Sequence, residues 1–367
     1  MNLPLIGLLT ATAFLLSAGL TWILTRLKTG LTPACEINER SLHTQPVPRG
    51  GGLAIVGAVL LGGFAAWRFG LLSTEIALPW GFAIALTATV SYIDDHRHLA
   101  PALRLTAQIL SIGIAALWFQ QPIHGLLPEL DLDAAWLTLP VALLFGVWMI
   151  NLYNFMDGLD GLAGGMTVFG FGALAVMGWI QNDPGFVIAN LLVVAGVLGF
   201  LPFNLPPATI FLGDIGSTVL GLLSAAYSLW ASGAGLIPLW ISALAFSPFI
   251  VDATVTLLLR ALRREKVWQA HRRHYYQRLA CLNQNDNRPA RVLRPEYLLM
   301  FCCALSAVLL LNADPVWAWP TLGFWAAVYL GLIQTVVWLE KRDPSTDAKP
   351  ESPQQSSPPH PRPTSHR

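Results

Sequence analysis

Residues 184–203 read PGFVIANLLVVAGVLGFLPF and contain no charged side chain. The hydrocarbon core of a bilayer is about 30 Å thick, and a helix needs about 20 apolar residues to cross it. This stretch therefore predicts a transmembrane helix. The whole chain has the same character, because 54% of its 367 residues are hydrophobic and only 12% are charged, against about a quarter in soluble domains. The composition excludes a soluble globular protein.

Ten other stretches are similarly long and apolar, so eleven transmembrane helices are expected in an all-α, polytopic membrane protein. The eleven are residues 3–25, 52–70, 76–93, 104–119, 136–150, 162–180, 184–203, 213–231, 235–259, 296–313 and 317–339. The fifth is short and could be a buried or tilted helix, which would leave ten.

The distribution of basic residues predicts the orientation. No Lys or Arg precedes the first apolar run, and Arg26 and Lys28 follow it, the reverse of the charge order in a signal peptide. A retained helix with its N-terminus outside is therefore expected. Of the 22 Lys and Arg residues, only Arg68 then falls at an external helix end, as the enrichment of these residues in cytoplasmic loops requires. We expect a membrane domain over 1–342 and a disordered cytoplasmic tail over 343–367.

Two compositional features argue against other kinds of ligand. The four cysteines form no CxxC pair, so a zinc site is not expected. The net charge of +1 gives no reason to expect a nucleic-acid partner.

Two adjacent carboxylates, Asp94 and Asp95, end the third apolar stretch. Neighbouring like charges repel, and such a pair is tolerated when a divalent cation or a cationic group neutralises it, or when one carboxyl holds a proton. The alternative is a solvated helix end in which Arg97 is the partner.

A denser polar motif, NLYNFMDGLDGLAGG, occupies residues 151–165. If the segment is helical, Asp157 and Asp160 share one face, and the glycines allow close approach of a ligand or of backbone. Two carboxylates and two asparagines, including Asn154, directly follow an apolar span. Folding alone does not explain them, so a functional site is indicated.

The segment after the seventh apolar stretch carries Asn204, Phe211 and Asp214 among several prolines. The prolines end one helix, and Asp214 could cap the next. Capping is thus the alternative to a ligand-binding role for Asp214.

The loop over residues 260–294 is strongly basic, with ten Lys or Arg against Glu265 and Asp286. Its run His271-Arg272-Arg273-His274 suits a phosphate ligand, although attraction to anionic lipid headgroups, at about 1 kcal/mol for each cation, is an alternative. Asp252, inside the ninth stretch, could pair with a basic residue of this loop.

The first loop adds Arg49 and the glycines 50–52, a turn at a helix start that could receive a phosphate on its backbone N–H groups. Carboxylates that bind Mg²⁺ and basic groups that bind phosphate are together what phosphoryl transfer needs. Two like charges 4 Å apart repel by about 4 kcal/mol at an effective dielectric constant near 20. Two phosphates therefore need neutralisation before they can react.

These motifs, in this order, resemble the polyprenyl-phosphate N-acetylhexosamine-1-phosphate transferases, glycosyltransferase family 4, whose superfamily includes phospho-MurNAc-pentapeptide translocase. The resemblance covers nearly all of residues 1–340. It implies an enzyme of the bacterial inner membrane that uses Mg²⁺, or Mn²⁺ in its place, at the cytoplasmic face. Such an enzyme transfers a sugar 1-phosphate from a UDP-N-acetyl-sugar to undecaprenyl phosphate among the membrane lipids and releases UMP.

The resemblance also implies roles for individual residues. Asp94, Asp95, His271 and His274 are expected to be catalytic, and Asp214 is expected to bind the metal. The residues expected to bind substrate, with Phe211 as a stacking surface for uracil, are Arg49, Asn154, Asp157, Asp160, Asn204, Phe211 and Arg272. The translocase branch has consecutive histidines and a different first-loop motif, so the branch that initiates O-antigen or related surface glycans is favoured.

Two other classes stay open on sequence alone. An intramembrane prenyltransferase also uses Asp-rich helix ends with Mg²⁺, but it does not depend on a nucleotide. A secondary transporter would place ionisable groups near the bilayer midplane, whereas the acidic residues here lie at the ends of the predicted helices.

Overall fold

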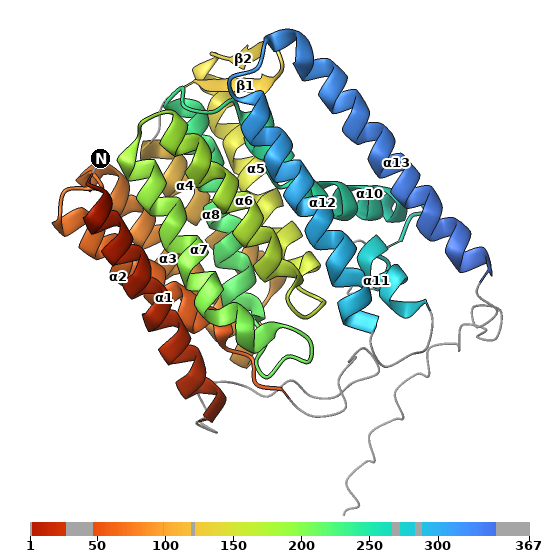
Figure 1. Ribbon diagram of the computed structural model, residues 1–367, viewed down its shortest axis with the longest axis horizontal. Helices are drawn as coiled ribbons and strands as arrows, with labels where there is room; N and C mark the ends of the chain where they lie inside the picture. Colours follow the sequence, from red (N-terminus) through yellow and green to blue (C-terminus); the bar gives the residue numbers. More distant parts are fainter. Residues whose placement is uncertain are drawn as a thin grey trace, which may run out of the picture.

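The computed structural model describes residues 2–26, 47–97, 99–118, 122–265, 272–282 and 288–342, most of them helical (Figure 1). The helices are α1 Leu3–Arg26, α2 Gly51–Arg68, α3 Thr74–Arg97, α4 Pro101–Trp118, α5 Ala135–Met156, α6 Leu162–Ile180, α7 Pro184–Asn204, α8 Gly213–Gly233, α9 Leu239–Ala245, α10 Ser247–Leu262, α11 Tyr275–Cys281, α12 Arg288–Leu310 and α13 Ala318–Arg342, with a 3-10 turn η1 at Pro315–Trp317. Two short strands, β1 Ile123–Leu127 and β2 Leu130–Leu132, complete the set.

Within these described ranges, nine helices are long and apolar enough to cross a membrane, or ten if α9 and α10 form one bent span. The all-α, polytopic membrane fold is thereby confirmed, and each of the eleven predicted stretches forms a helix or this bent pair. The alternative count of ten spans agrees with the upper number, but the short span is not the fifth stretch. Helix α5 has 22 residues, while the shorter apolar helix is the fourth, over Pro101–Ala116.

The ninth predicted span is broken. Helices α9 and α10 meet at Phe246 and are bent by 86° relative to one another. Pro248 lies in the first turn of α10, and proline has no N–H with which to continue the hydrogen bonds of a preceding helix. Asp252 therefore lies on a separate helix that crosses behind α12 in Figure 1, and not two turns inside a straight span.

The hairpin formed by β1 and β2 was not predicted. Its strands are antiparallel, with Ile123 opposite Leu132 and Leu127 opposite Leu130. Asp131 accepts a hydrogen bond of 2.6 Å from the backbone of Gly125. The Asp131 side chain thus stabilises this local fold.

Helix α8 lies at the centre of the bundle and is almost completely buried. Small residues let its neighbours approach, as is usual where membrane helices pack. A Cβ atom on Gly52 of α2 would lie 2.2 Å from the backbone nitrogen of Gly216, and one on Gly221 would lie 2.6 Å from the Cα atom of Ile150 in α5. This packing brings the starts of α2 and α8 and the ends of α3 and α5 to one end of the bundle.

The hairpin lies at the opposite end (Figure 1). Which end faces the cytoplasm stays a prediction, as does the division of the chain at residue 342. The predicted tail, 343–367, lies outside the described residues.

Candidate active site

Acidic side chains from three helix ends converge at one end of the bundle. Asp95 lies near the end of α3, Asp157 directly follows α5, and Asp214 lies in the first turn of α8. Asp157 interacts electrostatically with the other two, with Asp160 and with Arg49, which precedes α2. The structure therefore brings five of the predicted site residues together, although their roles stay predictions.

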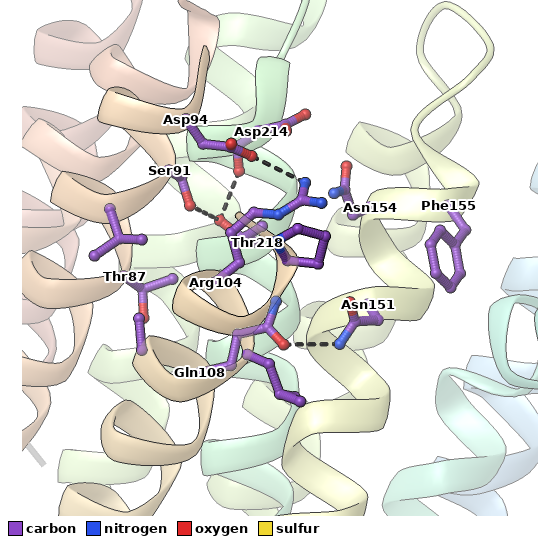
Figure 2. Close-up of a pocket in the computed structure, with 14 residues that line it drawn as sticks. Thr87, Ser91, Asp94, Arg104, Gln108, Asn151, Asn154, Phe155, Asp214 and Thr218 are labelled. Atoms are coloured by element: carbon purple, nitrogen blue, oxygen red, sulfur yellow. Dashed lines mark hydrogen bonds and ion pairs between the residues drawn. The ribbon is translucent and has the colours of Figure 1, made fainter. Parts of the chain in front are cut away.

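The two adjacent aspartates have different surroundings. Asp94 is buried, and one of its oxygens accepts a hydrogen bond of 3.0 Å from Arg104 (Figure 2). Its other oxygen accepts one of 2.6 Å from the backbone N–H of Leu99. The Asp95 Oδ1 atom is buried without a hydrogen-bond partner among the described residues. The cation that pairs with Asp94 is thus Arg104 rather than Arg97. Sequence reasoning missed Arg104, although an arginine at the start of an apolar stretch was a usable signal.

A cavity of about 270 Å³ lies beside these aspartates, between α3, α4, α5 and α8. Figure 2 shows Asp94, Asp214, Arg104 and Asn154 around one part of it. The lining also includes the apolar side chains Val90, Leu105, Ala107 and Phe155. The cavity therefore offers polar and charged groups together with an apolar wall, as an amphipathic ligand would require.

Deeper in this cavity, the helices are joined by hydrogen bonds between side chains. Asn151 of α5 donates to Gln108 of α4 at 2.8 Å, and the hydroxyls of Ser91 in α3 and Thr218 in α8 are 2.7 Å apart. Such bonds hold membrane helices in register, so they fix the width of the cavity.

The electrostatics of the cluster are unfavourable without a counter-ion. Burial raises the pKa of Asp157 well above its usual value, and the Asp214 carboxylate raises it further. Arg49 has the opposite effect but does not cancel these contributions. The cluster would therefore gain from a bound cation.

The residues of the cluster could hold a magnesium ion that is also coordinated by the phosphates of a substrate. No group of three or more His, Cys, Asp or Glu side chains able to hold a metal occurs among the described residues. Mg²⁺ often needs only one or two carboxylates, because substrate phosphates and water complete its octahedral shell. Asp214, together with the unpartnered oxygen of Asp95, meets that requirement.

Asp160 and Asn204 hold neighbouring loops together. Asp160 accepts a 3.0 Å hydrogen bond from the backbone of Ala208. Asn204 accepts one from Gly161 and donates one to the carbonyl of Ile210, both at 3.0 Å. Both side chains are buried. Their predicted contact with substrate stays a prediction, and the interactions seen here position the loops at the ends of α5 and α7.

The glycine-rich turn before α2 was wrongly predicted to have free N–H groups for a phosphate. Gly51 donates to the carbonyl of Phe211 at 3.0 Å, and Gly52 donates to that of Leu212 at 2.9 Å. In return, the N–H of Phe211 donates to the carbonyl of Pro48 at 2.9 Å. These bonds place residues 49 and 211 side by side through a parallel backbone bridge, and the glycines allow close helix packing instead.

The histidine motif is only partly described. His271 lies outside the described residues, and His274 is almost fully buried, with its Nδ1 atom 3.2 Å from an Asp252 oxygen. The predicted pairing of Asp252 with a basic residue of the loop is confirmed. Arg272 has one terminal nitrogen buried without a hydrogen-bond partner in the part of the chain that is described.

Comparison with known proteins places this site in a family. The sequence profile of glycosyl transferase family 4 matches residues 77–232. Phospho-N-acetylmuramoyl-pentapeptide-transferase of Halalkalibacterium halodurans is 32% identical over 222 residues, which are 57% of this chain and 68% of that protein. This chain belongs to glycosyl transferase family 4. The resemblance carried by the ordered motifs is thus confirmed.

Two relatives match this family 4 protein over more of its length. A protein of Bacillus subtilis named as a probable undecaprenyl-phosphate N-acetylglucosaminyl 1-phosphate transferase is 29% identical over 344 residues, 89% of this chain and 91% of that one. A decaprenyl-phosphate N-acetylglucosaminephosphotransferase of Mycolicibacterium smegmatis is 27% identical over 348 residues, 85% and 83% of the two chains. The family 4 profile contains Asp94 to Asp214, whereas Arg49 and His274 lie outside its match.

Proposed function

We propose that this family 4 protein transfers an N-acetylhexosamine 1-phosphate from a UDP-sugar to undecaprenyl phosphate and releases UMP. The observation that carries the proposal is the convergence of Asp95, Asp157 and Asp214 with Arg49 beside a partly apolar cavity. The names of the relatives describe transfer of N-acetylglucosamine phosphate to undecaprenyl or decaprenyl phosphate, which supports the same chemistry here.

The position of the cluster agrees with the two substrates. A prenyl chain gains about 0.8 kcal/mol for each buried CH₂ group and stays in the bilayer, whereas a UDP-sugar is soluble. Both can meet only where the membrane ends, and the carboxylates lie at helix ends. A transporter would need such groups near the midplane. We place the site at the cytoplasmic face of the bacterial inner membrane, where the reaction would start a lipid-linked surface glycan such as O-antigen.

In the proposed reaction, an oxygen of the lipid phosphate attacks the phosphorus that carries the sugar. The new P–O bond forms as the bond from that phosphorus to the UMP oxygen breaks. Arg49 offsets part of the negative charge on the attacking phosphate. Asp214 and Asp95 would hold Mg²⁺, or Mn²⁺ in its place, and the ion would offset the charge of the diphosphate.

The test is a reaction of the purified protein with undecaprenyl phosphate and a panel of UDP-sugars. Mass spectrometry should find undecaprenyl phosphate extended by one N-acetylhexosamine phosphate, with stoichiometric UMP. Because one phosphoanhydride replaces another, added UMP should drive the reaction backwards. Prenyl transfer without UMP release would support the prenyltransferase alternative, and accumulation of an unchanged substrate by proteoliposomes would support a transporter.

A further inference from the structure

Asp252 binds several groups of helix α11 at once. Its Oδ1 atom accepts a 3.0 Å hydrogen bond from the backbone N–H of Tyr275, and its Oδ2 atom accepts one of 3.1 Å from Tyr276. The same carboxylate lies 3.2 Å from the ring nitrogen of His274. Only 11% of the Asp252 side chain is exposed, and 2% of that of His274. The Asp252 carboxylate of α10 thus anchors the first turn of α11 and His274, the residue before this helix.

Helix α11 in turn contacts the segment that carries Asp157. The Tyr276 hydroxyl donates to the carbonyl of Phe155, in the last turn of α5, at 3.1 Å. The ring of His274 stacks at 6.2 Å from that of Phe155. A Cβ atom on Gly158 would lie 2.3 Å from the Tyr276 hydroxyl oxygen, so the turn after Asp157 is packed tightly against α11.

We propose that Asp252 is a positioning residue for the transfer reaction. It acts through His274 and α11, which hold the Asp157–Gly158 turn against the charged cluster. His274, predicted to be catalytic, is on this view part of the same support. The inference rests on the proposed function, because its effect is measured as turnover of UDP-sugar.

The first variant is Asp252→Asn, whose amide nitrogen cannot accept the second backbone hydrogen bond and whose side chain has no charge. A misplacement of about 1 Å at a reacting group can cost about 100-fold in rate. We therefore expect kcat/KM for the UDP-sugar to fall by about 10- to 100-fold. Part of the loss should appear as a higher KM, because Asp157 is expected to bind this substrate. KM for undecaprenyl phosphate should change less, because, among the described residues, α11 meets the cavity between α3, α4, α5 and α8 only through Phe155.

Three further variants separate positioning from general destabilisation. Asp252→Glu keeps the charge and should recover part of the lost activity. Adding His274→Gln to Asp252→Asn should cost little more than the single change, since both residues belong to one unit. Ser247→Ala, the matched control, removes a 2.7 Å hydrogen bond between α10 and Tyr329 in which no residue of α11 takes part, and should retain wild-type kinetics.

Hydrogen exchange of residues 275–281 provides a readout that does not depend on activity. In Asp252→Asn the amides of Tyr275 and Tyr276 should exchange faster than in the wild type. Unchanged exchange would overturn the inference, and so would faster exchange with an unchanged KM for the UDP-sugar. If the wild-type protein released no UMP at all, the proposed function would fail, and the exchange rates would still decide whether Asp252 holds α11.

Discussion

Neighbouring residues at the end of α3 illustrate how strongly a helix separates the roles of adjacent side chains. Successive residues of an α-helix point about 100° apart. Asp94 therefore faces Leu99 and Arg104, where its two oxygens are engaged, while Asp95 interacts with Asp214, Arg49 and the rest of the acidic cluster. Asp94 is suited to fix the helix end, and Asp95 has an oxygen available for a ligand.

Asp214→Asn should abolish Mg²⁺-dependent turnover while leaving the protein folded, because the change removes a negative charge from the cluster without altering side-chain size. UMP release would be measured against Mg²⁺ concentration after treatment with EDTA. Wild-type protein with Mg²⁺ restored is the control. Turnover close to the wild-type rate would exclude Asp214 as the metal ligand.

Asp157→Asn should stabilise the protein at neutral pH in EDTA and lower its activity. The pKa of Asp157 in the folded protein is raised by burial and by Asp214, so the folded state binds more protons than the unfolded state, in which the pKa is about 3.9. The proton on Asp157 therefore stabilises the folded protein at low pH. This stabilisation is lost as the pH rises from about 4 through the folded-state pKa. Thermal unfolding of both proteins between pH 5 and pH 8 would measure it.

In this comparison the melting temperature of the wild type should fall more steeply with pH than that of the Asn variant. Mg²⁺ should reduce the difference, since a cation lowers the cost of the charge. Parallel pH profiles in EDTA would show that Asp157 does not carry this cost.

At the scale of helices, close contact around α8 places the site. The N–H groups of the turn before α2 are bonded to the backbone of residues 211 and 212, and Gly52 lies against Gly216. Gly52 is needed for this packing rather than for a phosphate, because any Cβ atom at this position would meet backbone.

Gly52→Ala should therefore destabilise the protein, since overpacking costs about 1–3 kcal/mol. Gly63→Ala, the same change in the same helix, has no atom within 4 Å of the new Cβ and should stabilise it by about 0.5–1 kcal/mol, through the lower entropy of the unfolded chain. Thermal unfolding in one detergent would compare the two. A Gly52→Ala protein as stable as the wild type would contradict the close contact seen here.

All the described site residues lie at one end of the molecule. The side of the membrane that this end faces can therefore be tested. A membrane-impermeant maleimide should label Asp133→Cys, at the hairpin end, in intact cells. The native Cys281, exposed in α11, should react only after permeabilisation. The wild type without the new cysteine is the control, and labelling of Cys281 in intact cells would reverse the proposed orientation.

The sequence alone predicted those features of the fold that depend on local composition. Every apolar stretch but the ninth, which is broken into α9 and α10, became one helix. Asp95, Asp157 and Asp214 came together because alternating spans bring their ends to one side. The sequence did not predict features that depend on contacts between residues far apart in the chain. The pairing of Gly51 with Phe211 and the amides bound by Asp252 depend on packing that no local pattern encodes. Arg104, the partner of Asp94, is only 10 residues away and had a usable signal. The bend at Phe246 was missed although Pro248 was a visible signal.

The bridge between residues 48–52 and 211–212 has a consequence for how such enzymes diversify. It is built from main-chain atoms, so the identity of the side chains at positions 49 and 211 does not determine whether it forms. A change of side chain at position 49 or 211 therefore leaves the backbone scaffold beneath the site intact. Variation at these two positions does not require loss of the fold.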